Sequence, residues 1–294
     1  MMKDRMDTLA QAIDFWLKTY KKTSVKTATY DRLETSLKLL QHYPSIADVH
    51  WMNVDAKAIQ ALLNLMALDG YSDSTIKKMR DLVCAFYKYK LAMGDIQYPF
   101  YTVVKMPRNC PKKLVEGYIN GRADLIEAQL CHWGKPDIEL AVMLMHKAGL
   151  RIGEVLALDK NDILWSKNAV RISKTLVFPA SKDHSFIQYG AKTESSNRII
   201  PLPEDILQMF KDGIEPCKDY SAIRYWVRKA CKEHDIRYLG LHAFRHTFAT
   251  ECFHKGCDVK ILSKLLGHAD TNVTYNTYIH LYGDGLEEMR KIVG

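Results

Sequence analysis

Apolar residues recur every three or four positions through most of the first hundred residues, which is the period of amphipathic helices. Four stretches show this spacing: 9–20, 30–40, 55–70 and 72–94. The third begins with an aspartate that can cap a helix, and the last two end at glycine. The pattern predicts a small all-helical domain over residues 1–97.

The hydrophobic period changes in the second half of the chain. Helical spacing over 123–130 and 137–147 gives way to a period of two, with many β-branched and aromatic residues. The predicted strands are 162–165, 169–178 and 197–202, with a turn at 166–168. From Pro203 onward the spacing is helical again. We therefore expect a mainly α chain with a small antiparallel β-sheet, in which an α+β domain over 114–282 precedes a tail helix over 283–294.

Residues 98–113 interrupt both patterns. The segment holds three prolines and several basic residues, so neither a helix nor a central strand is expected there. We interpret it as a basic linker between the two domains. Its cations suit a chain that closes around a duplex and follows the phosphates.

Composition and charge narrow the class of partner. The chain has 294 residues, of which 47% are hydrophobic and 26% charged, as in ordinary globular proteins. Its net charge of +8 favours a polyanionic partner, nucleic acid before membrane. No apolar run is long enough to span a bilayer, and the first residues lack the apolar stretch of a secretory signal, so we expect a cytoplasmic protein.

The cysteines argue against a disulfide framework. Seven are present, an odd number without a Cys-x-x-Cys pair, which fits a reducing compartment. Cys252, His254 and Cys257 match no common zinc spacing. We expect no metal and no cofactor.

Basic side chains on the predicted helices and linker are candidates for DNA-backbone contact, although a lysine-rich helical face is often simply solvated. The set comprises Lys18, Lys21, Lys22, Lys77, Lys78, Lys105, Arg108, Lys112 and Arg228. Which of them face a groove and read bases cannot be decided from sequence.

Five short motifs follow one another in the second half. They are Ala148-Gly-Leu-Arg-Ile-Gly-Glu154, Lys192-Thr-Glu-Ser-Ser-Asn-Arg-Ile-Ile-Pro-Leu202, Leu241-His-Ala-Phe-Arg-His-Thr-Phe-Ala-Thr250, Leu265-Leu-Gly-His268 and Thr277-Tyr-Ile-His280. In this order they resemble the catalytic domain of the tyrosine recombinases, the phage integrase family. The resemblance extends to the helical first part, which is similar to that family's core-binding domain.

The residue types fit chemistry at a phosphodiester. Negative charge grows on the phosphate oxygens as a nucleophile adds, and arginine offers a fixed cationic fork, which makes Arg151 and Arg245 candidates. An ordinary ion pair between Arg151 and Glu154 is the alternative. His242 can accept a phenol proton or donate to a phosphate oxygen. His246 lies one position off the face of His242 in our interpretation and is expected to be structural.

The resemblance supplies three further roles. It makes Tyr278 the nucleophile, ahead of Tyr275 and Tyr282, and His268 a second phosphate-binding donor. It makes Lys192 the general acid that protonates the departing 5′ oxygen, with Lys182 as a rival in the same loop. A phenol has a pKa near 10, so Tyr278 needs activation by His242 and the arginines.

The implied reaction forms a 3′-phosphotyrosyl link and frees a 5′ hydroxyl, which reverses the attack on another strand. The phosphodiester energy is kept in the covalent link, so neither ATP nor a metal is implied. Exchange of strands in pairs implies four protomers on two DNA duplexes and a four-way (Holliday) junction. The tail helix is expected to dock on a neighbouring protomer, and an accessory DNA-bending or excision factor is a further possible partner.

Several functions remain open at this level. The long polar segment 179–190 favours a mobile-element integrase, and a chromosome-dimer resolvase or an inversion recombinase are alternatives. A type IB topoisomerase uses similar chemistry. A DNA-binding regulator without catalysis is the alternative of another class. The chain begins close to the core-binding helices, so we expect no separate arm-site-binding domain.

Overall fold

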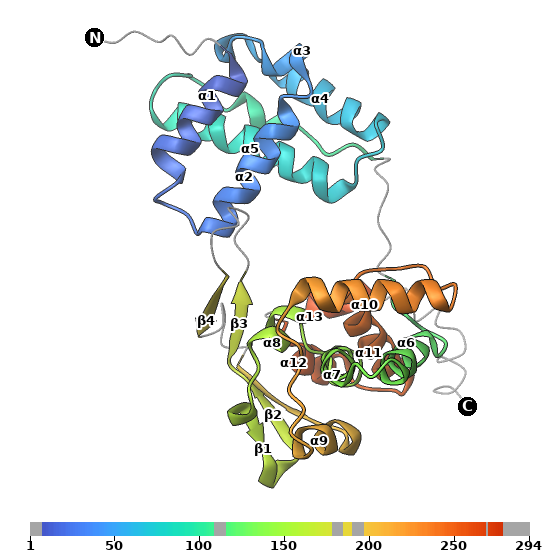
Figure 1. Cartoon of the computed structure of the whole chain (residues 1–294). Coiled ribbons are helices and arrows are strands. Elements are labelled where there is room, and N and C mark those ends of the chain that lie inside the picture. The colour runs from blue at the N-terminus through green and yellow to red at the C-terminus, as the bar shows by residue number, and fades with distance from the viewer. Residues whose placement is uncertain (1–7, 109–115, 178–184, 190–196, 269, 279–294) are drawn as a thin grey trace, which may run out of the picture. The chain divides into compact units, whose positions relative to one another are not determined.

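The computed structural model describes residues 8–108, 116–177, 185–189, 197–268 and 270–278. The chain forms two compact units, one built from the predicted helical domain and one from the predicted α+β domain (Figure 1). Each unit has its own buried apolar cluster. The expected fold class, mainly helical with small antiparallel sheets, is confirmed.

The first unit contains the four predicted helices, α1 Leu9–Trp16, α2 Thr27–Leu40, α4 Ala56–Leu68 and α5 Asp73–Ala92. A π-helical turn, Leu17–Lys21, extends the first of them. A short helix that the pattern did not predict, α3 Pro44–Ala47, precedes the 3-10 turn Trp51–Asn53. Asp55 caps α4 as expected, since its side chain accepts from the backbone N–H of Ala58 at 2.7 Å.

Aromatic rings fill the core of this unit. The ring centroids of Trp16 and Phe86 lie 5.9 Å apart edge to face, and the Tyr87 hydroxyl donates to the carbonyl of Trp51 at 2.7 Å. The predicted linker contributes here too. A 3-10 helix, Phe100–Val103, lies in the segment expected to lack helix, and Val104 after it is buried against the same core. The amide of Gln60 bonds both backbone groups of Lys105.

The helices of the second unit agree with the predicted spacing, except for α8 Ile152–Ala157, which was not predicted. They are α6 Arg122–His132, α7 Pro136–Lys147, α8, α9 Glu204–Lys211, α10 Tyr220–Glu233, α11 His242–His254, α12 Val259–Leu266 and α13 Thr271–Tyr278. Helix α7 is buried along nearly all of its length, and α6, α8, α9, α10 and α11 contact it. Among the described helices, none has the length and apolar character required to cross a membrane.

The strands form two small sheets instead of the predicted single one. Strands β1 Ile163–Leu164, β2 Ala169–Ile172 and β5 Arg198–Pro201 are antiparallel in the order β1-β2-β5. Strands β3 Lys174–Val177 and β4 Phe186–Tyr189 pair separately. The prediction of one strand over 169–178 was therefore wrong, because Ser173 separates β2 from β3. Strand β4 lies in a run that was expected to be a loop: its Phe186, Ile187 and Tyr189 are exposed, so cross-strand pairing and not burial stabilises it.

Candidate active site

Arg151 lies at the start of α8, directly after the turn that follows α7. Its backbone N–H and its Nη1 donate to the two carboxylate oxygens of Glu154, at 2.8 and 2.9 Å. Its Nη2 donates to the carbonyl of Gly267 at 3.0 Å. The ion pair considered as an alternative therefore exists, but the same guanidinium also reaches the end of α12. About a third of its side chain remains exposed, so a phosphate can approach it.

The turn before Arg151 depends on Gly149. The residue has a φ of +67°, which favours glycine, and a Cβ added there would lie 2.5 Å from Cδ1 of Phe248. The carbonyl of Gly149 accepts from Nη1 of Arg245 at 2.6 Å. The absence of a side chain at this position therefore lets α11 lie close to the turn that carries Arg151.

Gly149→Ala is expected to destabilise the protein by about 2–4 kcal/mol, because left-handed strain adds to overpacking against Phe248. Urea unfolding of the whole chain measures the change. Gly134→Ala is the matched control: its φ is +63° but an added Cβ meets nothing within 4 Å, so only the strain of about 1 kcal/mol is expected. Equal losses in the two variants would show that the contact with Phe248 is unimportant.

Arg245 is the most buried cation of the site, with 2% of its surface exposed. Besides Gly149 it bonds the carbonyl of Leu266, and its Nη2 lies 3.2 Å from Nε2 of His268. Because a guanidinium only donates, Nε2 of His268 must accept. The proton of that ring then lies on Nδ1, which donates to the buried hydroxyl of Thr274 at 2.6 Å.

His268 is accordingly neutral in this arrangement. Burial, with the charges of Arg245 and Arg151, lowers its pKa to about 4. Donation from Nε2 to a phosphate oxygen, as the resemblance implies, requires this nitrogen to gain a proton. The negative charge of a bound phosphate would favour that protonation.

His242 and His246 occupy successive turns of α11. Their ring centroids lie 4.6 Å apart, edge to face. The expectation that His246 lies off the face of His242 was wrong, because residues four apart share one face of a helix. The pKa of each ring is lowered to about 4, first by partial desolvation of the ring and then by nearby positive charges, including that of Arg245. A neutral His242 at the exposed edge of the site is in the form that accepts a proton.

Part of the predicted catalytic set lies beyond the described residues. Lys192, its rival Lys182 and Tyr282 lie outside the described residues. Tyr278 is the last residue of α13, but its side chain is outside the described part. Its helix contacts α12 and supplies Thr274, which bonds His268 one turn before Tyr278. Tyr275, on the same helix, is 46% exposed.

A buried ion pair at this site was not anticipated from the sequence. Both terminal nitrogens of Arg198 donate to the carboxylate of Glu154 at 2.9 Å, and its Nε donates to the carbonyl of Leu265 at 2.7 Å. Burial opposes the charge of Glu154, but hydrogen bonds and charge from Arg198 and Arg151 lower its pKa to about 2. One signal was available: Arg198 shares the inward face of its predicted strand with Ile200, where apolar residues are usual.

A second polar cluster lies between α6, α7 and α11. Nδ1 of His146 is 2.7 Å from Glu127 on α6, and its Nε2 is 3.5 Å from Glu251 on α11. Lys147 is 3.3 Å from the carboxylate of Glu127. Asp124, Glu127 and His146 have potential ligand atoms within 4.8 Å of one another. Because Glu127 and His146 bond each other and Lys147 also neutralises the carboxylate, we interpret the cluster as an ionic network that joins three helices.

The predicted DNA-contacting residues of the first unit lie at its surface. Lys22, Lys77, Lys78, Lys105 and Arg108 are exposed. Lys18 pairs with Asp14 at 2.7 Å, and Lys21 lies over the ring of Trp16 at 5.1 Å. Lys112 is outside the described residues.

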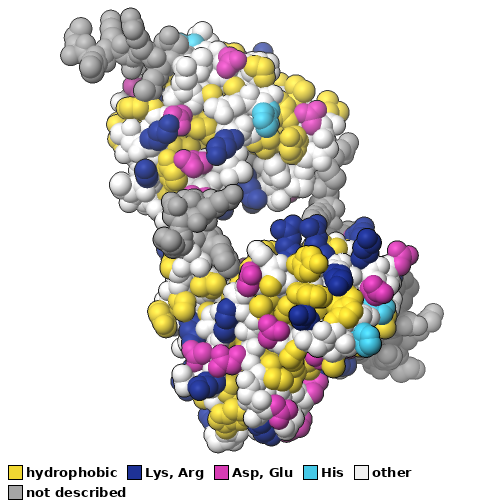
Figure 2. All heavy atoms as spheres, in the orientation of Figure 1, with side chains coloured by type: hydrophobic (Ala, Val, Ile, Leu, Met, Phe, Trp, Pro, Cys, Tyr) yellow, Lys and Arg dark blue, Asp and Glu magenta, His cyan; other side chains and the backbone are white. Residues whose placement is uncertain are grey.

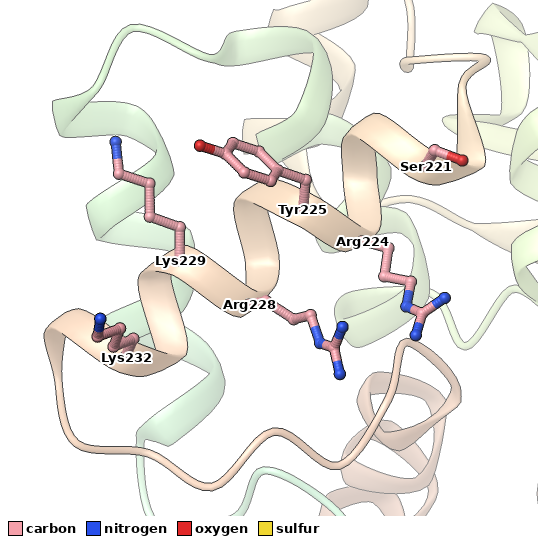
Figure 3. Close-up of a pocket in the computed structure, with 6 residues that line it drawn as sticks. All are labelled: Ser221, Arg224, Tyr225, Arg228, Lys229 and Lys232. Carbon is pink, nitrogen blue, oxygen red and sulfur yellow. The ribbon is translucent and has the colours of Figure 1, made fainter.

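The surface of α10 carries more positive charge than the sequence analysis assigned to it. Lys and Arg side chains gather over this helix in Figure 2. A surface pocket along it is lined by Ser221, Arg224, Tyr225, Arg228, Lys229 and Lys232. Arg224 and Arg228, one turn apart, extend to the same side of the helix (Figure 3). Only Arg228 was predicted, although the spacing of four residues was visible in the sequence.

Two comparisons with known sequences agree with each other. The profile of the phage integrase family matches residues 131–284. A XerC-like tyrosine recombinase from Caldanaerobacter subterraneus is 25% identical over 93% of this chain and 79% of its own length. Transposase A of transposon Tn554 from Staphylococcus aureus is 31% identical, over 51% of this chain and 45% of its own length.

Comparison with solved structures supports the fold. The integrase of transposon Tn1549, in complex with transposon right end DNA, matches 98% of this chain and all of its own with a TM-score of 0.75 and 21% identity. A lambda integrase tetramer bound to a Holliday junction matches 93% of this chain and 78% of its own, with a TM-score of 0.63 and 17% identity.

Proposed function

Because the chain belongs to the phage integrase family and is therefore a tyrosine recombinase, we propose that it integrates and excises a mobile element at specific DNA sites. One observation carries the assignment of the site: Arg151, Arg245 and His268 converge at the end of α12, beside the helix that ends at Tyr278. Together with Arg198 and Glu154, the cluster contains three guanidinium groups and one carboxylate, so its net charge is positive. That charge suits a phosphodiester that gains negative charge during attack.

In the proposed reaction the oxygen of Tyr278 forms a bond to phosphorus as the bond from phosphorus to the 5′ oxygen breaks. The phenol proton passes to neutral His242, and Lys192 protonates the departing oxygen. Arg151 and Arg245 bind the non-bridging oxygens. A 5′ hydroxyl from another strand then attacks the 3′-phosphotyrosyl link and releases the phenol, so that the number of phosphodiester bonds is unchanged.

The relatives of this chain favour a function in the movement of a mobile element. Transposase A of Tn554 and the Tn1549 integrase both belong to transposons, and the second resembles this chain over nearly its whole length. The proposed partner is double-stranded DNA with specific sites, inside the bacterial cytoplasm. Four protomers would exchange strands through a four-way junction, with the segment 283–294 docking on a neighbouring protomer and an accessory DNA-bending or excision factor assisting.

A chromosome-dimer resolvase is the second candidate. The XerC-like relative, which matches 93% of this chain, favours it. The two functions differ in the DNA that is cut. An integrase acts at the ends of the element that carries its gene, whereas a resolvase acts at a chromosomal site wherever the gene lies.

A suicide substrate tests the proposed function. Nicked duplexes carrying either the junctions of the element or candidate chromosomal sites are incubated with the full chain, and covalent adducts are separated under denaturing conditions. We expect a 3′-linked adduct and a free 5′ hydroxyl on the element junctions. An adduct on chromosomal sites alone would favour the resolvase, and relaxation of supercoils without any specific site would favour a topoisomerase.

Arg224→Ala and Arg228→Ala are each expected to weaken DNA binding about tenfold and to reduce the salt dependence of the affinity by about one phosphate contact, because α10 offers these cations together (Figure 3). Titration of labelled duplex at several salt concentrations measures both quantities. Lys211→Ala removes an exposed charge from α9 as a control. If the salt dependence of the DNA affinity is unchanged in both arginine variants, α10 is not part of the proposed DNA interface.

A further inference from the structure

The end of α12 has an unusual set of hydrogen-bond partners. Its last turn closes with the N–H of Gly267 on the carbonyl of Lys264 and the N–H of His268 on that of Ser263, both at 3.0 Å. Three successive carbonyls then remain, those of Leu265, Leu266 and Gly267. Each of these carbonyls accepts a hydrogen bond from an arginine of a different element: Arg198 donates to the first, Arg245 to the second and Arg151 to the third.

Glu154 connects two of these arginines. A carboxylate has about four acceptor positions, and four hydrogen bonds reach Glu154, from the backbone and side chain of Arg151 and twice from Arg198. Arg198 therefore occupies half of the carboxylate. Arg151 is left with a single side-chain bond to it, which keeps Nη2 of Arg151 available for the carbonyl of Gly267.

We propose that Arg198 is a positioning residue for DNA cleavage: it holds Glu154 and the last turn of α12, and through them sets the Arg151 guanidinium and His268. The inference rests on the proposed roles of Arg151 and His268. Without Arg198, the carboxylate of Glu154 can form a bidentate ion pair with the guanidinium of Arg151. The carbonyl of Leu265 also loses its hydrogen-bond donor. Arg198 is only 9% exposed, so we expect it to act through its protein partners and not by contacting the DNA.

Single-turnover cleavage of a suicide substrate by Arg198→Gln and Arg198→Lys tests this proposal. A positioning role predicts a rate constant about 10- to 100-fold lower at saturating DNA in both variants, with the final amount of adduct preserved. Lysine keeps the charge but cannot span Glu154 and Leu265 at once. A purely structural role would lower the amount of adduct and leave the rate constant unchanged, which would overturn the proposal.

Arg171→Gln is the matched control, because Arg171 faces solvent on β2, the strand paired with β5. It should leave the rate unchanged, and equal effects at Arg171 and Arg198 would contradict the inference.

A measurement without DNA separates this inference from the proposed function. Histidine titration by NMR should show a higher pKa for His268 in Arg198→Gln than in the wild type, because the charge of Arg198 helps to lower it. The Arg171→Gln control should not shift. An unchanged His268 titration in Arg198→Gln would overturn the inference whether or not the wild type cuts the chosen DNA. Failure of the wild type to cut any substrate, with the shift present, would count against the proposed function alone.

Discussion

Tyr278→Phe is expected to lower covalent attachment to DNA by more than about a thousandfold, because the variant lacks the oxygen that we propose attacks phosphorus. Its affinity for DNA should stay within about twofold of the wild type, since phosphate contacts dominate binding. The suicide substrate gives the first quantity as adduct formed with time. Titration of the same duplex under conditions that prevent cleavage gives the second.

Tyr275→Phe is the control for this substitution. It makes the same chemical change three residues earlier on α13, at an exposed position. Adduct formation should continue, with at most a modest loss if Tyr275 helps to position its neighbour. An adduct that persists in Tyr278→Phe and disappears in Tyr275→Phe would transfer the nucleophile to Tyr275.

Arg245→Lys is expected to slow cleavage about 100- to 1000-fold, an effect comparable to the loss of one oxyanion donor. It should also destabilise the protein by about 1–3 kcal/mol. A single ammonium cannot reach the carbonyls of Gly149 and Leu266 and the ring of His268 together. At least one buried acceptor then loses its partner. Single-turnover cleavage at saturating DNA measures the first effect, and urea unfolding the second.

Arg228→Lys provides the comparison for Arg245→Lys, because Arg228 is exposed on α10 and stacks on Tyr238 at 4.9 Å. This variant should keep its stability and its cleavage rate at saturating DNA. A wild-type cleavage rate in Arg245→Lys would show that any cation suffices at that position and that the guanidinium geometry of Arg245 is not required.

The longer helices could be predicted from the sequence because each depends on local information, whereas the short helices α3 and α8 were not predicted. The hydrophobic period and the end signals of α4 and α5 lie within single stretches, and Asp55 caps α4 as predicted. The second sheet was not predicted. Strand β4 is exposed and shows no clear apolar alternation, so its structure depends on pairing with β3, which the pattern of one segment does not encode.

The candidate site was predictable as a set of residue types, but its geometry was not. The motifs identified Arg151, Arg245 and His268, which the structure brings together at one helix end. Three of the bonds that hold Arg151 and Arg245 run to the backbone carbonyls of Gly149, Leu266 and Gly267, and any residue type supplies a carbonyl. The partners of Arg198 could not be predicted for a different reason, because Glu154 and Leu265 are distant from it in sequence.

The three carbonyls at the end of α12 have a consequence for synthesis of the chain. The bond from Arg151 to Gly267 joins residues 116 positions apart, and that from Arg245 to Gly149 spans 96. Contacts of such long range carry a large loop-closure cost and slow folding. A ribosome must therefore release the segment around residue 267 before the guanidinium cluster can assemble, by which time the helical first unit has already emerged. If Arg151, Arg245 and His268 have the roles proposed above, a nascent chain therefore cannot cleave DNA until this segment has left the ribosome.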